Sequence, residues 1–359
     1  MITMIDDHDS IQNQIEQMVL DGPHVVILGA GATMAAIPEG DKNGVKSSVM
    51  NDFIKNLHLD DVMKGVKLRT RSRNLESIFS ELCEHQEYVG VRDELEQKIY
   101  SFYSSLIIPD RPTAYDYLIL SLRDKDSIFS FNWDNLLVQA YSRCMKITTN
   151  LPQMYFLHGN VGVSYCKHCH ILQKKSNHTC IKCGKVLEPT QLLYPVKNKD
   201  YTASQYLQEV WATFEKQLDT ASILTVFGYS APKTDAAAKK IMRNAFANRI
   251  RWYDQFEVVD KADSDKIYKT WDKFIAATHG HIEISDSIFK KTLIGEFPRR
   301  TVEGYVKRNL TGWWGTSAIQ LHECKDFPEL EDLLKPLIVQ EENGDYSVIP
   351  IKHYDSERK

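Results

Sequence analysis

The sequence contains few of the features that mark fibrous, disordered or membrane-spanning proteins. Among its 359 residues are only 17 glycines and 12 prolines, and we find no internal repeat and no low-complexity segment. The longest stretch without Asp, Glu, Lys, Arg or His covers residues 25–38, which is too short to cross a bilayer as a helix. Hydrophobic residues make up 43% and charged residues 26%, so the composition is that of a globular protein with a sizeable core.

The sequence also lacks an excess of charge of either sign. Its 44 Lys and Arg residues nearly balance 48 Asp and Glu residues, and the net charge of −4 gives no reason to expect direct nucleic-acid binding. The opening residues, MITMIDDHDS, are acidic where a secretory signal would be basic, and no apolar segment of the required kind follows them. We therefore expect a cytoplasmic protein that does not bind membranes.

A disulfide framework is not expected either, because cysteines in a reducing cytoplasm rarely pair. Four of the seven cysteines instead form two close pairs, Cys166-x2-Cys169 and Cys180-x2-Cys183. Thiolates at this spacing predict a tetrahedral zinc site. A nearby histidine is an alternative ligand in place of one cysteine: His168, His170 or His178. Because a four-cysteine site leaves no open coordination position, we expect the zinc to stabilise a small module over residues 161–189 rather than to act in catalysis.

Short apolar segments alternate with helical patterns along most of the chain. The segment His24–Leu28 contains β-branched residues and is bounded by Gly-Pro and by Gly29, as is typical of a buried strand. Further candidate strands lie at residues 128–131, 154–157, 223–228, 256–260 and 281–284. The alternation predicts an α/β fold in which a Rossmann-like parallel sheet has helices on both faces.

The other segments are arranged around this sheet. Residues 50–110 have helical spacing and predict a helical insertion, and further helices are expected over residues 10–20 and 329–337. The Rossmann-like domain would then comprise residues 1–49, 111–160 and 190–285. Residues 286–359 carry no motif. They contain large apolar residues that favour either oligomerisation and partner contact or packing on the chain's own core: Trp313, Trp314, Leu321, Phe327, Leu330, Leu333 and Leu334.

A glycine-containing turn follows the first strand directly, from Gly29 to Thr33. Glycines at this place permit a tight turn and let backbone amides approach a pyrophosphate. The third glycine of a dehydrogenase fingerprint is Met34 here, and no strand ending in an acid follows about 20 residues later. Taken alone, the turn fits either a nucleotide site or a plain connection from strand to helix.

Polar side chains follow several of the predicted strands. Asn132 and Asp134 come after one, His158 after the next, and Asp260 closes a later one. Each of them alone also fits an ordinary structural role such as a helix cap. Ligands of open α/β sheets bind beyond the carboxyl ends of the strands, so the convergence of these residues with the glycine turn predicts a ligand site there.

The ordered set of motifs resembles the sirtuin family. Gly-Ala-Gly-Ala-Thr, Phe-Asn-Trp-Asp, Leu-His-Gly, the paired cysteines and Gly-Tyr-Ser follow one another within residues 25–260, which is most of the chain. The similarity is closer to the bacterial sirtuin-like NAD hydrolases of anti-phage defence. It implies NAD as the substrate, with the pyrophosphate and ribose lined by the turn residues Gly29, Ala30, Gly31, Ala32 and Thr33.

The resemblance also implies roles for the polar strand ends. Asn132 and Asp134 match the family's Asn-x-Asp, which holds the nicotinamide end and the ribose. His158 matches its catalytic histidine, so these three residues would form the catalytic group. Other NAD contacts implied by the family fall on the phosphate-side loop and at the adenosine half, at Gly228, Ser230 and Asp260.

The chain departs from sirtuin deacylases at three places. Residues 37–41, Ile-Pro-Glu-Gly-Asp, replace Ile-Pro-Asp-Phe-Arg, Phe131 replaces the family's Gln, and residues 192–195 replace the strand that holds the acyl peptide. The residues that cleave NAD are retained, so we expect water to act as nucleophile and NAD to be hydrolysed to nicotinamide and ADP-ribose. The alternatives are an NAD-dependent protein deacylase and a non-catalytic sensor of NAD or ADP-ribose.

An NAD hydrolase without regulation would harm its host, so we expect its activity to be gated. The resemblance implies an anti-phage system, often encoded beside a second protein such as a DNA-translocating ATPase. In this family, segments such as residues 50–110 tend to cover the NAD cleft, and assembly could move them. We therefore expect a homo-oligomer with low basal hydrolysis.

Overall fold

The structure is a computed structural model, and it describes eleven stretches of the chain. These are residues 21–47, 53–57, 59–72, 74–196, 199–232, 235–247, 252–275, 281–311, 315–317, 319–348 and 350–353. The helix expected over residues 10–20 and the pair Trp313-Trp314 lie outside them.

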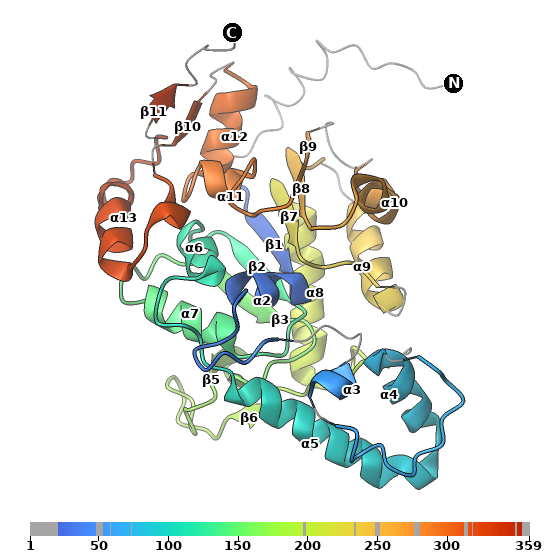
Figure 1. Cartoon of the computed structure of the whole chain (residues 1–359). Coiled ribbons are helices and arrows are strands. Elements are labelled where there is room, and N and C mark those ends of the chain that lie inside the picture. The colour runs from blue at the N-terminus through green and yellow to red at the C-terminus, as the bar shows by residue number, and fades with distance from the viewer. Residues whose placement is uncertain are drawn as a thin grey trace, which may run out of the picture.

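A six-stranded parallel sheet forms the centre of the molecule, in the order β3-β2-β1-β7-β8-β9 (Figure 1). Its strands are β1 (His24–Leu28), β2 (Ser127–Ser130), β3 (Gln153–Phe156), β7 (Ile223–Phe227), β8 (Gln255–Val259) and β9 (Ile282–Ser285). In chain order this is the 3-2-1-4-5-6 arrangement of dinucleotide-binding α/β sheets. The expected fold class is confirmed, and every predicted strand boundary lies within one residue of the observed one.

Helices cover both faces of the sheet because the side chains of each strand alternate between the faces. In β1, Val26 and Leu28 pack with one core and Val25 and Ile27 with the other, and all four are fully buried. The first core includes residues of α2 (Ala30–Ala36), α6 (Ala114–Leu120) and α7 (Leu136–Cys144). The second includes residues of α8 (Gln205–Thr220), α9 (Ala236–Ala247) and α10 (Ser264–Ile275).

The helical insertion lies beyond the end of the sheet at which the strands finish (Figure 1). It contains α3 (Phe53–Asn56), α4 (Leu75–Glu84), the 3-10 helix η1 (Gln86–Tyr88) and α5 (Val89–Ser105). Phe79 and Leu82 of α4 and Leu95 and Ile99 of α5 are buried in the same core as α6 and α7. The insertion is therefore packed on the sheet domain at the edge where a ligand would bind.

A small antiparallel sheet in the order β5-β4-β6 forms the module that carries the paired cysteines. Its strands are β4 (Val163–Cys166), β5 (Ile171–Lys174) and β6 (Glu188–Pro189). The module contacts the helical insertion, because the Lys175 ammonium lies 4.3 Å from the centre of the Tyr100 ring of α5.

The C-terminal region packs on the sheet domain. It contains α11 (Leu293–Glu296), α12 (Thr301–Asn309), β10 (Gly315–Ser317), η3 (Leu321–Glu323), α13 (Phe327–Glu342) and β11 (Pro350–His353). Arg299, fully buried, donates to the carbonyl oxygens of Leu120 and Leu122 and pairs with Glu341 of α13.

Several apolar residues that favoured an oligomer interface lie inside the chain. Leu321, Leu330 and Leu334 are buried in the core shared with α6 and α7. For these leucines the alternative of packing on the chain's own core is the correct one. Among the described residues, no helix combines the length and apolar character needed to cross a bilayer.

Candidate functional site

The glycine turn sits at the point where the strand order reverses, between β1 and β7. The Gly29 and Gly31 amides donate to the Phe227 and Gly228 carbonyl oxygens at 3.0 and 2.9 Å. A Cβ atom on Gly31 would lie 2.7 Å from the Gly228 Cα, and Gly228 itself has a φ of +64°. Glycine is therefore required at these positions, because the turn after β1 and the loop after β7 touch each other. The crevice in which ligands of such sheets bind lies beyond these strand ends.

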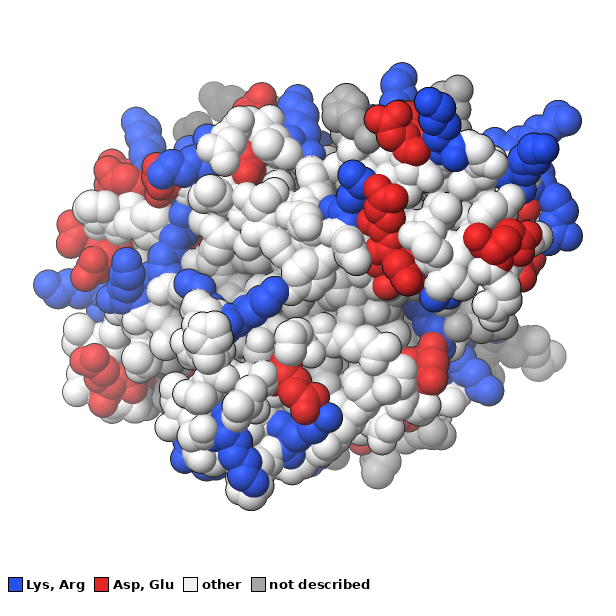
Figure 2. Space-filling model, turned by 90° about the horizontal axis from the view of Figure 1, so that it is seen from below, with Lys and Arg blue, Asp and Glu red and all other residues white. Residues whose placement is uncertain are grey.

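A cavity of about 410 Å³ occupies this crevice, a volume typical of small-molecule sites. Figure 2 views the molecule from the side toward which the strands point, and that surface is hollowed near its centre, with charged side chains of both signs at the edge of the hollow. The strand-end residues and the insertion both contribute to the cavity wall: Gly29, Ala30, Gly31, Thr33, Ser47, Asn74, Glu76, Tyr103, Phe131, Asn132, Trp133, Asp134, His158, Pro195, Lys199, Gly228, Tyr229, Ser230, Pro232, Asp235 and Asp260.

The cavity brings together all but one of the residues expected to contact NAD. The exception is Ala32, whose side chain is buried in the core below the turn and does not line the cavity. The lining residues follow the strands in spatial order, from His158 after β3, through Asn132 and Thr33, to Ser230 and Asp260 after β7 and β8.

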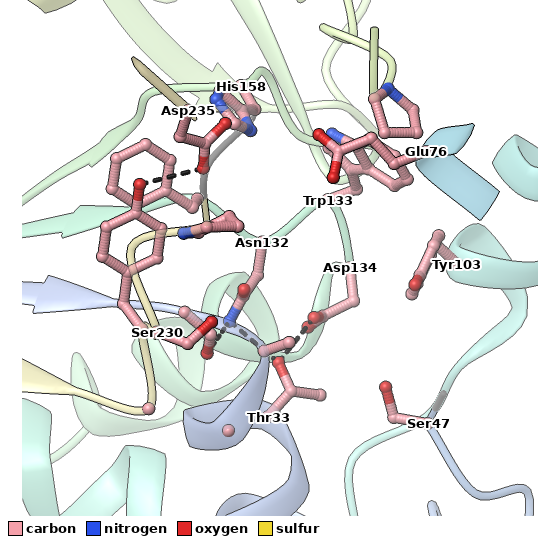
Figure 3. A pocket seen from close by; sticks show the side chains of 18 of the residues that line it. Thr33, Ser47, Glu76, Tyr103, Asn132, Trp133, Asp134, His158, Ser230 and Asp235 are labelled. Atoms are coloured by element: carbon pink, nitrogen blue, oxygen red, sulfur yellow. Dashed lines mark hydrogen bonds between the residues drawn. The ribbon is translucent and has the colours of Figure 1, made fainter. Parts of the chain in front are cut away.

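At the end of the cavity near β1 and β2, an amide, a hydroxyl and a carboxyl group form a hydrogen-bond network (Figure 3). The Asn132 Nδ2 group donates to the Gly29 carbonyl oxygen at 2.8 Å and to the Thr33 Oγ1 at 3.0 Å. The Thr33 hydroxyl donates to the Asp134 Oδ2 at 2.8 Å. Tyr115 of α6 joins the network, with its Oη 2.8 Å from the Thr33 Oγ1 and 3.2 Å from the Asn132 Nδ2.

The network fixes which way the Asn132 amide points. The Gly29 carbonyl can only accept, so the Asn132 amide nitrogen must face it. The Asn132 Oδ1 makes no hydrogen bond with the described residues and remains for the cavity. Burial raises the pKa of Asp134 above its ordinary value, against the hydrogen bonds from Thr33 and the Leu136 amide, which lower it.

The other end of the cavity, near β3, is charged. Lys199 is 4% exposed and pairs with Asp235, which is 5% exposed, and its ammonium lies 3.7 Å from the Glu76 carboxylate. The Tyr229 hydroxyl donates to the Asp235 Oδ2 at 2.9 Å. Three separate segments, from α4, from the loop before α8 and from the start of α9, therefore meet at this end of the cavity. Asp235 lies next to His158 (Figure 3).

His158 has a far lower proton affinity than the free side chain. Its ring lies edge-on to Phe131, with 4.8 Å between the ring centroids, and its Nε2 is buried without a hydrogen-bond partner among the described residues. Burial lowers the pKa of His158 to about 4, while Asp235 raises it and Lys199 lowers it further. The imidazole is therefore neutral at pH 7, with its pKa well below the ordinary value of 6.5.

Sequence reasoning missed several of the residues at the site. Tyr115 lies more than 80 positions from Thr33, at the start of a helix with no motif. Lys199, Asp235 and Glu76 carry no local signal of a site, because only the folded chain places them in the cavity.

The four paired cysteines converge in the small module. Their sulfur atoms all lie within 4.8 Å of one another, and the Cys166 and Cys183 sulfurs are 3.6 Å apart. Tetrahedral zinc with Zn–S bonds of about 2.3 Å would separate its sulfurs by about 3.8 Å, so the group fits such an ion. His170, one of the alternative ligands, instead contacts the Glu209 carboxylate of α8 at 2.7 Å.

No known protein-family model matches the chain, and no curated protein matches its sequence. Among solved structures, one similar to it is Sir2 in complex with an inhibitor, 2'-O-acetyl-ADP-ribose and a deacetylated peptide. It has 14% identity over 80% of this chain and 93% of that chain, with a TM-score of 0.34. Two variants of a Sir2 homologue with ADP-ribose each have 13% identity over 86% of this chain and 98% of that chain, with a TM-score of 0.36. At these values the likeness is distant.

Proposed function

We propose that the cavity binds NAD and hydrolyses its nicotinamide–ribose bond, giving nicotinamide and ADP-ribose. The observation that carries this proposal is the arrangement at the strand reversal point. There, one cavity is lined by the glycine turn, by the Asn132 amide and by the neutral, buried His158. The Asn132 amide is held in one orientation by its hydrogen bond to the Gly29 carbonyl oxygen. The motifs that resemble sirtuins supply these same residues.

The order of the lining residues supports one orientation for the substrate. They follow five adjacent strands, which at about 4.8 Å per strand span about 19 Å, a length suited to an extended dinucleotide. The glycine turn at the centre would face the pyrophosphate. The nicotinamide half would then lie toward Asn132, Asp134 and His158, and the adenosine half toward Ser230 and Asp260.

The chemistry needs groups that stabilise positive charge on the ribose and take up a proton from water. Cleavage of a glycosyl bond builds oxocarbenium character, and a fixed oxygen dipole stabilises it without reorganisation. The Asn132 Oδ1 would supply that dipole and orient the attacking water, while Asp134 would bind the carboxamide. His158, neutral at pH 7, would accept the proton as the new C–O bond forms and the bond to nicotinamide breaks.

The segment that replaces the acyl-peptide strand favours water over a peptide as nucleophile. The Leu193 amide donates to the His158 carbonyl at 2.9 Å, and Pro195 lines the cavity. The pairing of Lys199 with Asp235 and Glu76 fills the adjacent side of the cavity with buried charges. Buried charges do not suit the apolar acyl chain of a modified lysine, which favours water as the nucleophile.

The test is to incubate the purified chain with NAD, with and without an acetylated peptide. Hydrolysis predicts nicotinamide release at the same rate in both samples. Release only with the peptide would identify a deacylase. Binding of NAD or ADP-ribose without nicotinamide release in either sample would identify a sensor.

We further propose that the four cysteines hold one structural zinc ion. When bound, the ion would crosslink the two cysteine-bearing turns and leave no position for substrate. The thiolates of Cys166, Cys169, Cys180 and Cys183 would supply all four ligands.

We also propose that the protein is a cytoplasmic effector of anti-phage defence whose NAD hydrolysis is held low in the isolated chain. The activity would rise when the chain assembles with further copies of itself or with a co-encoded ATPase. Asn74, Glu76 and Tyr103 bring the helical insertion into the cavity wall, so a movement of the insertion would change access. Light scattering and NAD cleavage across one dilution series test this. A monomer with full activity at every concentration would contradict it.

A further inference from the structure

Tyr115 is a fully buried residue of the network that no motif singles out. It is the second residue of α6, and its side chain has 0% exposure. The start of α6 is fixed by a capping box, in which the Thr113 amide donates to the Asp116 Oδ2 at 2.7 Å. Arg143 of α7 in turn donates to the Asp116 Oδ1 at 2.5 Å. The start of α6, which carries Tyr115, is therefore tied to α7.

The hydrogen bonds around Tyr115 show which group donates in each of its contacts. The Asn132 amide nitrogen can only donate, and its two protons are shared among the Gly29 carbonyl oxygen, the Thr33 Oγ1 and the Tyr115 Oη, which accepts at 3.2 Å. The Thr33 hydroxyl proton is directed to Asp134, so Thr33 accepts from Tyr115 at 2.8 Å. The Tyr115 hydroxyl thus accepts a hydrogen bond from Asn132 and donates one to Thr33.

We infer that Tyr115 is a positioning residue for NAD cleavage, because its hydroxyl holds the Asn132 amide and the Thr33–Asp134 pair in the orientation that the reaction needs. This inference rests on the proposed function of the same cavity. Tyr115 does not line the cavity, and it acts only through the residues that do.

The surroundings keep the Tyr115 hydroxyl in its donor form. Burial and the nearby Asp134 carboxylate raise the pKa of Tyr115 well above its ordinary value, while its hydrogen bonds with Thr33 and Asn132 lower it. The phenol therefore stays protonated throughout the pH range in which the protein would work. Removal of the Tyr115 hydroxyl would deprive the Thr33 Oγ1 of a donor and the Asn132 Nδ2 of an acceptor.

The same helix offers a matched control. Tyr117 lies two residues further along α6 and donates a part-buried hydrogen bond to the Cys324 carbonyl oxygen at 2.7 Å, but it faces the C-terminal region. Tyr115→Phe and Tyr117→Phe each delete one hydroxyl and keep the ring. A purely structural role for Tyr115 predicts the same kinetic behaviour for both variants.

The experiment compares kcat, KM and thermal stability of the two variants with the wild type. We expect Tyr115→Phe to lower kcat about tenfold to a hundredfold with KM within about twofold, because a misaligned amide affects the transition state more than binding. Tyr117→Phe should keep the wild-type kcat. Equal kcat values for both folded variants would overturn the inference.

A second readout separates this inference from the proposed function. The side-chain amide signal of Asn132 in a protein labelled with ¹⁵N-asparagine, assigned by its loss in Asn132→Asp, should shift in Tyr115→Phe and stay in place in Tyr117→Phe. A wild type that releases no nicotinamide would refute the hydrolase, while this shift would still report on the positioning. An unshifted signal in Tyr115→Phe would refute the positioning whatever the activity.

Discussion

The two ends of the cavity differ in how they hold their polar side chains. The end near β1 and β2 holds Asn132, Thr33 and Asp134 through hydrogen bonds of 2.8 to 3.0 Å that set the orientation of the Asn132 amide. The end near β3 places His158 among the paired charges of Lys199 and Asp235. The first end can fix geometry and the second can set proton affinity, and glycosyl hydrolysis needs both.

The largest expected effect comes from the charged end. His158→Ala should lower kcat for NAD cleavage by about 10² to 10⁴-fold, because it removes the group that accepts the proton. The matched control is His24→Gln at the opposite end of β1. His24 is also a buried histidine, with a pKa lowered to about 3 by burial and by Lys125, but it lies far from the cavity and bonds Thr225 at 2.7 Å. A folded His158→Ala variant with near-normal turnover would remove this residue from the mechanism.

The geometric end is tested by Asn132→Ala. We expect kcat to fall by about 10² to 10³-fold, which is the usual cost of losing one preorganised group that stabilises developing charge. Circular dichroism should show an intact fold, and binding of ADP-ribose should weaken much less than turnover. An unchanged kcat in this variant would show that the fixed amide is not used.

A change in pH dependence would sharpen the contrast between the two ends. His158 must be unprotonated to act as a base, so activity should persist as pH falls through 6.5 and be lost only as pH falls toward about 4. Lys199→Met removes a charge that lowers the pKa of His158 and leaves Asp235, which raises it. The acidic limb of the kcat profile should therefore move to higher pH, whereas it should stay in place in Lys42→Met, whose partner Asp110 is exposed.

The smallest effect on chemistry is expected from the cysteine module. Cys180→Ser should lower the thermal midpoint and the zinc content, which we expect to be about one equivalent in the wild type, but lower kcat of the folded protein only slightly. Cys83→Ser, at an exposed cysteine outside the module, should change neither. Wild-type protein that is folded, active and free of metal would contradict a structural zinc.

The contrast between the ends also separates what the sequence predicts from what it does not. The strands and the glycine turn were predictable because apolar segments bounded by glycine or proline leave few alternatives. Asn132 and His158 were found because they directly follow such strands. The shifted pKa of His158 and the meeting of Lys199 with Asp235 depend on burial and on contacts between distant segments, which no local pattern contains.

The C-terminal leucines illustrate the same limit. Leu330 and Leu334 have a spacing that fits an interface as well as a core, and only the packing of α13 against the rest of the chain decides between them. Tyr115 is a second case. Its capping box predicts where α6 starts, but not which residues its hydroxyl reaches.

The most direct test of the central claim is the product balance of the purified chain with NAD as the only added substrate. We predict nicotinamide and ADP-ribose in equal amounts, at a rate that a peptide does not change and that Asn132→Ala and His158→Ala each lower by at least about 10²-fold. Nicotinamide released only when an acylated peptide is present, or release that survives both substitutions, would contradict hydrolysis of NAD at this site.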